Sequence, residues 1–188
     1  MRIAVTGTPG TGKTTAVAAV TTPHQTVHLN DVIRAEGLTT AHDEERDSAV
    51  VDMDAVADWL RDRDECIFES HLAHRFDADR VVVLRCHPEE LTERLRGRGA
   101  GDESDKGDES DKGDESVTAK SEASIAENAE SEALDLILSE AVERHGRSRV
   151  YEIDTTGRTP QDVAADIEAV ITGEREPSAG EVSFLEYL

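Results

Sequence analysis

The sequence predicts an α/β fold in which a central five-stranded parallel sheet is flanked by helices. Short apolar segments alternate along the chain with longer segments of helical periodicity, and this alternation is typical of βαβ units. The apolar segments predict strands at residues 2–6, 26–29, 65–68, 81–85 and 150–154. A length of 188 residues suits one compact domain, which we place at residues 1–172, followed by a flexible tail at residues 173–188.

The segments between the strands predict helices at residues 13–20, 52–62, 88–96, 121–144 and 160–171. Two of these helices begin with recognisable signals. Thr159 offers an N-cap hydroxyl directly before Pro160, and proline is favoured at the first helical position. Pro88 is likewise followed by two glutamates, whose negative charge is favoured by the helix dipole in a first turn.

The composition is strongly acidic, with 42 Asp and Glu residues against 20 Lys and Arg and a formal charge of −22. Only four of the basic residues are lysine. In dilute buffer the repulsion among these charges would oppose compaction, whereas at molar salt the Debye length falls to about 3 Å and screens it. The composition therefore indicates adaptation to a very salty cytoplasm, and it argues against a non-specific DNA binder or a binder of anionic membranes.

The cysteines and the hydropathy pattern bear on the environment of the protein. Cys66 and Cys86 lie inside or just after apolar runs and form no CxxC pair, so we expect buried, reduced thiols. No apolar stretch approaches the roughly 18 residues of a membrane span, and the N-terminus runs directly into a motif without a signal peptide. We therefore expect a cytoplasmic protein that does not enter a membrane.

Residues 101–116 read GDESDKGDESDKGDES, two and two-thirds copies of a hexapeptide. The segment holds eight acids, two lysines and no apolar residue, so it predicts a disordered, solvated loop. Calcium binding is a more specific alternative, because Asp and Glu recur near glycine. However, the spacing of these acids fits neither an EF-hand nor a nonapeptide β-helix.

The tail combines a polar linker with an apolar end. Pro177 and Gly180 precede five apolar residues, Val182, Phe184, Leu185, Tyr187 and Leu188. The linker half is expected to be flexible. The apolar end either docks on the body or contacts a partner, and the sequence leaves both open.

The clearest functional signal is GTPGTGKT at residues 7–14, which matches the phosphate-binding pattern GxxxxGK[ST]. It follows a predicted strand and opens a predicted helix, which is the context that a P-loop requires. The GTPase signature NKxD does not occur in the sequence. The motif also lies within the first 15 residues of a short chain, as it does in small kinases.

Each residue of this loop has an expected role toward ATP. Gly10 and Gly12 let the chain wrap with its N–H groups directed at phosphate oxygens. Lys13 is expected to bridge the β- and γ-phosphates, and the Thr14 hydroxyl to ligate Mg²⁺. Thr15 is expected to contact the α-phosphate.

The order and spacing of further motifs resemble the adenylate kinase isoenzyme 6 family, the adenylate-kinase-like ATPases of archaea and the eukaryotic nucleus. The resemblance covers most of residues 1–172 apart from the repeat. The motifs are DVIRAEGL at 31–38, EERD at 44–47, VDMD at 51–54, FESH at 68–71, LRCHP at 84–88, ERL at 93–95, RG at 98–99, EN at 127–128 and VYEIDTTGR at 150–158.

The resemblance implies a P-loop NTPase fold with two small inserts, an NMP-binding region at about residues 30–53 and a lid at about residues 97–120. It implies Mg²⁺-dependent transfer of a phosphoryl group from ATP to a nucleoside monophosphate (NMP), together with ATPase activity. It also implies transient binding to a small-subunit ribosomal protein during subunit maturation. Two alternatives stay open: an ATPase assembly factor with little kinase activity, and a P-loop kinase of a non-nucleotide acceptor.

Individual residues acquire expected roles from the same resemblance. Arg34 would hold the acceptor phosphate, and Glu69 would hold Mg²⁺ through water. His71 would take part in catalysis or in coupling to hydrolysis. Arg94 and Arg98, four residues apart on one helix face, would neutralise charge on the transferred phosphoryl group.

Plainer interpretations compete with these roles. Arg34 could be a surface arginine, His71 a structural histidine, and the two lid arginines part of a salt-bridged helix face that includes Glu90 and Glu93. The chain also departs from the family: Glu69 replaces the usual aspartate, and Ala100 with the acidic repeat replaces an aromatic residue and a compact lid. In similar kinases the loop that follows the last strand packs beside the adenine ring, so the resemblance implies this role for residues 154–158.

Overall fold

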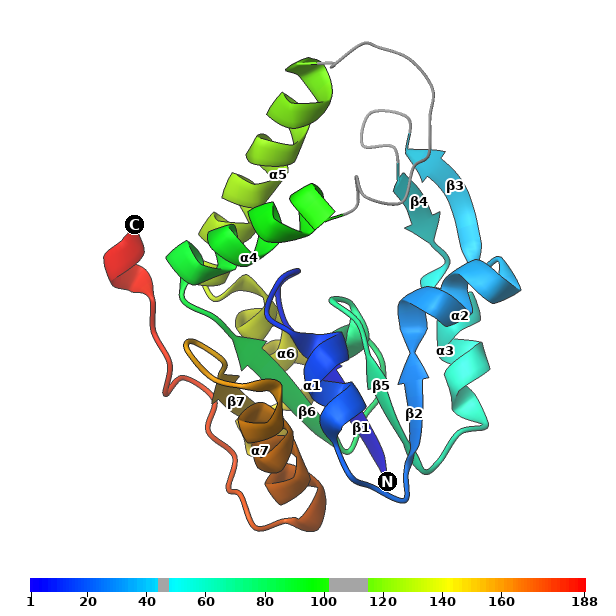
Figure 1. Cartoon of the computed structure of the whole chain (residues 1–188). Helices are drawn as coiled ribbons and strands as arrows, with labels where there is room; N and C mark the ends of the chain where they lie inside the picture. Colours follow the sequence, from blue (N-terminus) through cyan, green and yellow to red (C-terminus); the bar gives the residue numbers. More distant parts are fainter. Residues whose placement is uncertain (44–47, 102–114) are drawn as a thin grey trace.

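The computed structural model describes the backbone of residues 1–43, 48–101 and 115–188, and the side chains of residues 1–40, 50–97 and 122–188. Its centre is a five-stranded parallel sheet with the strand order β2-β5-β1-β6-β7 (Figure 1). The strands are β1 (Arg2–Thr6), β2 (Gln25–His28), β5 (Cys66–Glu69), β6 (Arg80–Arg85) and β7 (Val150–Asp154). The predicted sheet is thus confirmed, and each strand begins and ends within one residue of its predicted bounds.

Helices cover both faces of this sheet. On one face, α1 (Lys13–Ala19) and α7 (Pro160–Thr172) pack over Ile3, Val5 and their neighbours. On the other face, α6 (Leu136–His145) packs with Ala4 in the second core cluster. Consecutive residues of β1 therefore enter opposite cores, because side chains alternate across a strand.

The predicted start signals set the helix N-termini. The Thr159 hydroxyl accepts from the Asp162 N–H while the Asp162 carboxylate accepts from the Thr159 N–H, which forms a complete capping box with Pro160 at the first position. Helix α4 (Pro88–Gly101) begins at the predicted proline and carries both glutamates in its first turn.

The single helix predicted at residues 121–144 was wrong, because the chain breaks at Asp135. Helix α5 (Glu115–Ala133) ends before this residue, and α6 begins directly after it. Asp135 takes a left-handed backbone conformation with φ of 55°, which aspartate tolerates better than most residues. Its carboxylate forms an ion pair with Arg85, so a tertiary contact accompanies the local break.

An insert follows β2 at one edge of the sheet (Figure 1). It consists of α2 (Leu29–Glu36), an antiparallel hairpin of β3 (Thr39–Asp43) and β4 (Ser48–Val51), and α3 (Met53–Arg61). The expected NMP-binding region falls on this insert, although the hairpin was not predicted. Most of the acidic repeat, residues 102–114, lies outside the described residues; its ends belong to α4 and α5.

The C-terminal segment, residues 173–188, lies against the body, which differs from the flexible tail expected from the sequence. The Ser178 N–H donates to the Val150 carbonyl at 3.1 Å, so the segment is bonded to β7. Phe184 is buried and packs edge-on against His87, with ring centroids 5.4 Å apart. The apolar end therefore docks on the body, one of the two alternatives that the sequence left open.

Both cysteines are free and buried, as expected. Burial raises the pKa of the Cys86 thiol to about 11 and also raises the pKa of Cys66, so both thiols stay protonated near neutral pH. Among the residues that the structure describes, no helix combines the length and apolar character needed to cross a membrane.

Candidate active site

The phosphate-binding loop joins β1 to α1 in a conformation that only glycine permits at two points. A Cβ atom on Gly7, whose φ is 142°, would lie 2.4 Å from the Leu84 carbonyl oxygen. A Cβ atom on Gly10, whose φ is 98°, would lie 2.8 Å from the side chain of Leu91. The loop therefore packs directly against β6 and α4, and its shape is fixed by the core beneath it.

Lys13 is buried within this loop, with only 8% of its surface exposed. Its Nζ donates to the Gly7 carbonyl at 2.9 Å and to the Thr8 carbonyl at 3.0 Å. The ammonium group thus lies over the main chain that would surround a phosphate. A phosphate oxygen in the loop would offer this ammonium a charged acceptor, and hydrogen bonds of that kind are the stronger ones.

Three side chains meet at the carboxyl ends of β2 and β5. The Thr14 hydroxyl donates to Glu69 Oε1 at 3.1 Å, and His28 Nδ1 lies 2.9 Å from the same oxygen. Sequence reasoning missed His28, although a signal was available: His28 and Glu69 end neighbouring parallel strands and are paired in register.

This arrangement fits a magnesium ion. Mg²⁺ in nucleotide sites takes one or two protein oxygens, with phosphates and waters completing an octahedron. Thr14 and the buried Glu69 carboxylate supply such oxygens beside the loop. The longer side chain of Glu69, compared with aspartate, still brings its carboxylate to Thr14.

Two cavities open on either side of the loop. The β5-side cavity, about 190 Å³ in volume, is lined by Pro9, Gly10, Gly12, Lys13, Thr14, Asn30, Glu69 and His71. The α7-side cavity, about 350 Å³, is lined by Gly10, Thr11, Gly12, Thr15, Ala16, Arg94, Thr155, Arg158, Pro160 and Val163. Gly10 and Gly12 belong to both, so the loop forms the wall that the two cavities share.

His71 is brought into the β5-side cavity together with Lys13 and Glu69. Burial lowers its pKa below the usual 6.5, and the Lys13 ammonium lowers it further. The imidazole is therefore neutral at neutral pH, and one ring nitrogen can accept a hydrogen bond while the other donates.

Arg94 reaches the α7-side cavity from α4. Its guanidinium donates to the Thr155 hydroxyl at 3.2 Å, to the Thr155 carbonyl at 2.8 Å and to Glu90 Oε1 at 2.5 Å. Arg94 thus forms a salt bridge with Glu90, as the alternative interpretation expected. It also lines the α7-side cavity, as the proposed catalytic role requires. Arg98 lies one turn farther along α4, and its side chain is outside the described residues.

Of the predicted site residues whose side chains the structure describes, Arg34 is the one that is not brought to the loop. Its side chain is 76% exposed on α2 and, among the residues that the structure describes, bonds within its own helix, to Asp31 Oδ1 at 3.0 Å and to the Asn30 carbonyl at 3.1 Å. It lines neither cavity. Asn30, one turn earlier, does reach the β5-side cavity.

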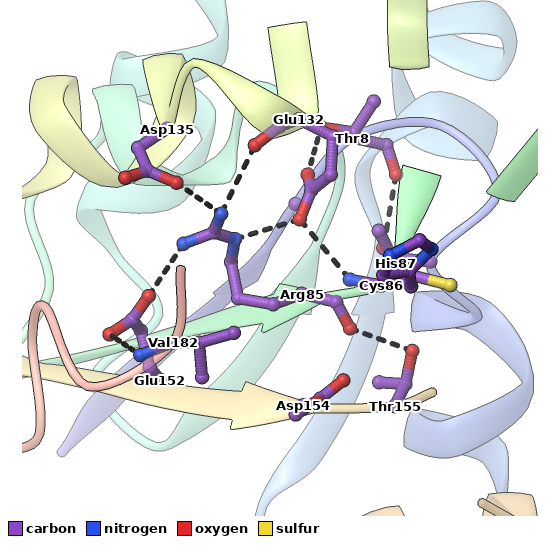
Figure 2. Close-up of polar contacts among 12 residues, drawn as sticks. Thr8, Arg85, Cys86, His87, Glu132, Asp135, Glu152, Asp154, Thr155 and Val182 are labelled. Carbon is purple, nitrogen blue, oxygen red and sulfur yellow. Dashed lines mark hydrogen bonds and ion pairs between the residues drawn. The ribbon is translucent and has the colours of Figure 1, made fainter. Parts of the chain in front are cut away.

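A buried charge cluster behind the loop was not anticipated (Figure 2). Arg85 is 1% exposed, and its guanidinium forms ion pairs with Glu132 at 2.7 Å, with Glu152 at 2.6 Å and with Asp135. Burial lowers the pKa of Arg85, but the Glu132 and Asp135 carboxylates outweigh this effect and leave that pKa raised. Arg85 is therefore charged at every physiological pH.

Comparisons with known proteins agree with this geometry. Residues 3–135 match the family model of an AAA domain. The chain is 55% identical to a protein of Natronomonas pharaonis and 51% identical to one of Halobacterium salinarum, covering all of each chain. A Methanosarcina acetivorans protein is 40% identical over 91% of this chain and 86% of its own. All three are named "Putative adenylate kinase".

A solved structure shares the fold at low sequence identity. A sulfotransferase from Alicyclobacillus acidocaldarius superposes with a TM-score of 0.53 at 14% identity, over 98% of this chain and 86% of its own. A likeness of this kind bears on the fold alone. From the family match and the full-length relatives, the chain belongs to the P-loop kinase-like family that the archaeal proteins named "Putative adenylate kinase" represent.

Proposed function

We propose that this protein transfers the γ-phosphoryl group of ATP to AMP or another nucleoside monophosphate, with Mg²⁺ as cofactor. The observation that carries the proposal is the placement of one phosphate-binding loop between two cavities of different character. The α7-side cavity combines Pro160 and Val163 with polar groups, which suits a base and ribose. The β5-side cavity gathers Lys13, Glu69 and His71, which suits the reacting phosphates.

In the proposed reaction, an oxygen of the acceptor phosphate attacks the γ-phosphorus. The bond between that phosphorus and the oxygen bridging to the β-phosphate breaks, so ATP and AMP become two molecules of ADP. Magnesium, when bound, neutralises charge on the phosphates. Lys13 would move from the loop carbonyls to the β- and γ-phosphates, while Glu69 and Thr14 would hold the metal side of the site.

Positioning and charge neutralisation can account for such a reaction without a covalent intermediate. Arg94, and Arg98 beyond it on α4, would neutralise the phosphoryl group during transfer. ATP hydrolysis is the same displacement with water in place of the acceptor, so we include ATPase activity in the proposal. His71, neutral and in the cavity, could accept a hydrogen bond from that water.

The direct test is ADP formation from ATP and AMP in concentrated KCl with magnesium present. Lys13→Met should lower turnover by about 10³-fold or more, because the variant removes a preorganised charge from the phosphates. Arg61→Met is the matched control, since it removes one positive charge from the exposed end of α3 and should leave turnover unchanged. Wild-type protein that forms no AMP-dependent product would refute the proposal.

A screen of acceptors separates this proposal from kinases of other substrates. Nucleoside monophosphates and small alcohols are offered in parallel with ATP at a fixed concentration. Product formation from an alcohol, and not from any monophosphate, would favour a non-nucleotide acceptor.

A ribosomal protein of the small subunit is proposed as a partner on the strength of the sequence resemblance. The formal charge of −22 is electrostatically suited to a basic protein, although molar salt weakens such attraction. Affinity capture at high salt, repeated with ATP, with ADP and without nucleotide, tests the partner. Recovery of no ribosomal protein in any of these states would remove it.

A further inference from the structure

We propose that Glu132 is a positioning residue for the phosphate-binding loop. Through Arg85 and Glu152, it also links that loop to the C-terminal segment. The inference rests on the proposed binding of ATP, because its effect is read from nucleotide affinity.

The first contact joins α5 to the loop. The Thr8 hydroxyl donates to Glu132 Oε2 at 2.5 Å, and both residues are almost completely buried. The carbonyl of the same Thr8 accepts from Lys13 Nζ at 3.0 Å and from the Thr11 hydroxyl at 3.0 Å. The orientation of Thr8 therefore helps to determine where the Lys13 ammonium lies and how the loop turns.

The second contact fixes the Glu132 carboxylate itself. Its other oxygen, Oε1, accepts from Arg85 Nε at 2.7 Å and from the Cys86 N–H at 3.1 Å. Arg85 Nη2 also donates to the Glu132 main-chain carbonyl at 3.1 Å. Glu132 is thus held from β6, on the side away from Thr8, and presents a fixed acceptor to the loop.

The third contact extends from Arg85 to the end of the chain (Figure 2). Arg85 Nη1 donates to Glu152 Oε1 at 2.6 Å. Glu152 Oε2 accepts three successive N–H groups of the C-terminal segment, from Gly180 at 2.6 Å, Glu181 at 2.8 Å and Val182 at 3.3 Å. Gly180, with φ of 88°, permits the turn that directs these groups at one oxygen, a main-chain nest for an anion.

The charge balance of this cluster explains why the phosphate-binding loop and the C-terminal segment should respond to each other. One guanidinium faces three carboxylates, those of Glu132, Glu152 and Asp135. The excess negative charge is offset by neutral donors, the Thr8 hydroxyl at one end and the three N–H groups at the other. If the donors at one end are lost, the buried carboxylate there lacks hydrogen-bond donors. Arg85 is then drawn toward that carboxylate and away from the carboxylate at the other end.

Thr8→Val tests the link at the loop, because valine has nearly the shape of threonine without its hydroxyl. The dissociation constant for ATP should rise about tenfold or more, as expected for a lost hydrogen bond to a buried carboxylate. Thr8→Ser keeps a hydroxyl and should restore most of the affinity. Binding of adenosine, which lacks phosphates and would use the α7-side cavity, should change little in either variant. Equal losses for ATP and adenosine would show a general structural defect and overturn the positioning role.

The link to the C-terminal segment is tested by hydrogen exchange in the wild-type, full-length protein. Because coupling between two sites is reciprocal, ATP binding should change the exchange rate of the amides of residues 180–182. Thr8→Val should abolish this change even at ATP concentrations that saturate the variant. Identical exchange with and without ATP in the wild-type protein would overturn the link.

These outcomes are separable from failure of the proposed function. If the wild-type protein binds no ATP, the proposed function fails. If it binds ATP and forms ADP from AMP, but Thr8→Val binds ATP as tightly as the wild type, only the positioning role of Glu132 fails.

Discussion

Two arginines on opposite sides of β1 in the sheet order show how differently the two halves of the site are built. Arg85, at the end of β6, is buried and shared among three carboxylates. Arg34, on the insert that follows β2, is exposed, and its bonds to described residues lie within its own helix. The phosphate-binding loop is therefore held by the core, whereas the proposed acceptor residue is not held in the site. In the proposed kinase, the side of the site that would hold ATP is thus preorganised, whereas the residue that would hold the acceptor phosphate is still exposed to solvent.

The largest expected difference between the two arginines is in stability. Arg85→Met should lower the free energy of unfolding by about 3–5 kcal/mol, because it leaves buried carboxylates without their cation. Arg34→Met should change it by no more than about 0.5 kcal/mol, since an exposed i,i+3 pair contributes little. Urea denaturation of both variants at one fixed KCl concentration measures this. Similar effects at the two positions would contradict the comparison.

Arg34 should affect the binding of the acceptor and not the binding of ATP. Arg34→Ala is expected to raise the KM for AMP about tenfold, a loss of roughly 1.4 kcal/mol, as the insert closes without its phosphate ligand. The KM for ATP and the thermal midpoint should stay at wild-type values. Unchanged kinetics toward AMP would leave Arg34 as a solvated surface residue.

His71 should make stability depend on pH in a defined direction. Because its folded-state pKa is lowered from 6.5, the unfolded chain takes up a proton that the folded protein does not. The free energy of unfolding should therefore fall as the pH drops from 6.5 to the lowered pKa, and level off below it. His71→Gln should show a shallower fall in urea denaturation between pH 7.5 and pH 5. His74, whose pKa burial also lowers, contributes to the pH dependence of both proteins.

The smallest effect is expected from the acidic repeat. Deletion of residues 101–116 should leave ADP formation within a few-fold of the wild type, since long surface insertions are tolerated at a slowly growing entropic cost. The matched control replaces the same residues with a Gly/Ser linker of equal length. A collapse of activity in the deletion, but not in the control, would point to linker length, and a collapse in both would assign a role to the repeat itself.

Local signals in the sequence predicted the sheet and the loop. The strands are apolar runs of characteristic length, and the loop has a fixed pattern of glycines with one lysine and one threonine. The capping box at Thr159 is equally local, because its partners lie three residues apart. Each of these features is decided by neighbours in the chain, so a single sequence contains the information.

The buried polar contacts could not be predicted in the same way. Thr8 and Glu132 are separated by 124 positions, and nothing beside either residue indicates the other. The break at Asp135 and the docking of the C-terminal segment both involve the same cluster, with Asp135 bonding to Arg85 and the segment bonding to Glu152. Prediction therefore failed where a long-range charge contact outweighed local helical or disordered character.

The three groups that cap Glu152 are main-chain N–H groups, so the cap depends on the backbone turn at Gly180 and not on the side chains of Glu181 and Val182. Substitutions of those two side chains should therefore be tolerated, whereas any other residue at position 180 would strain a turn that needs a positive φ. The amino acids of this segment can thus vary while its hold on the charge cluster is kept.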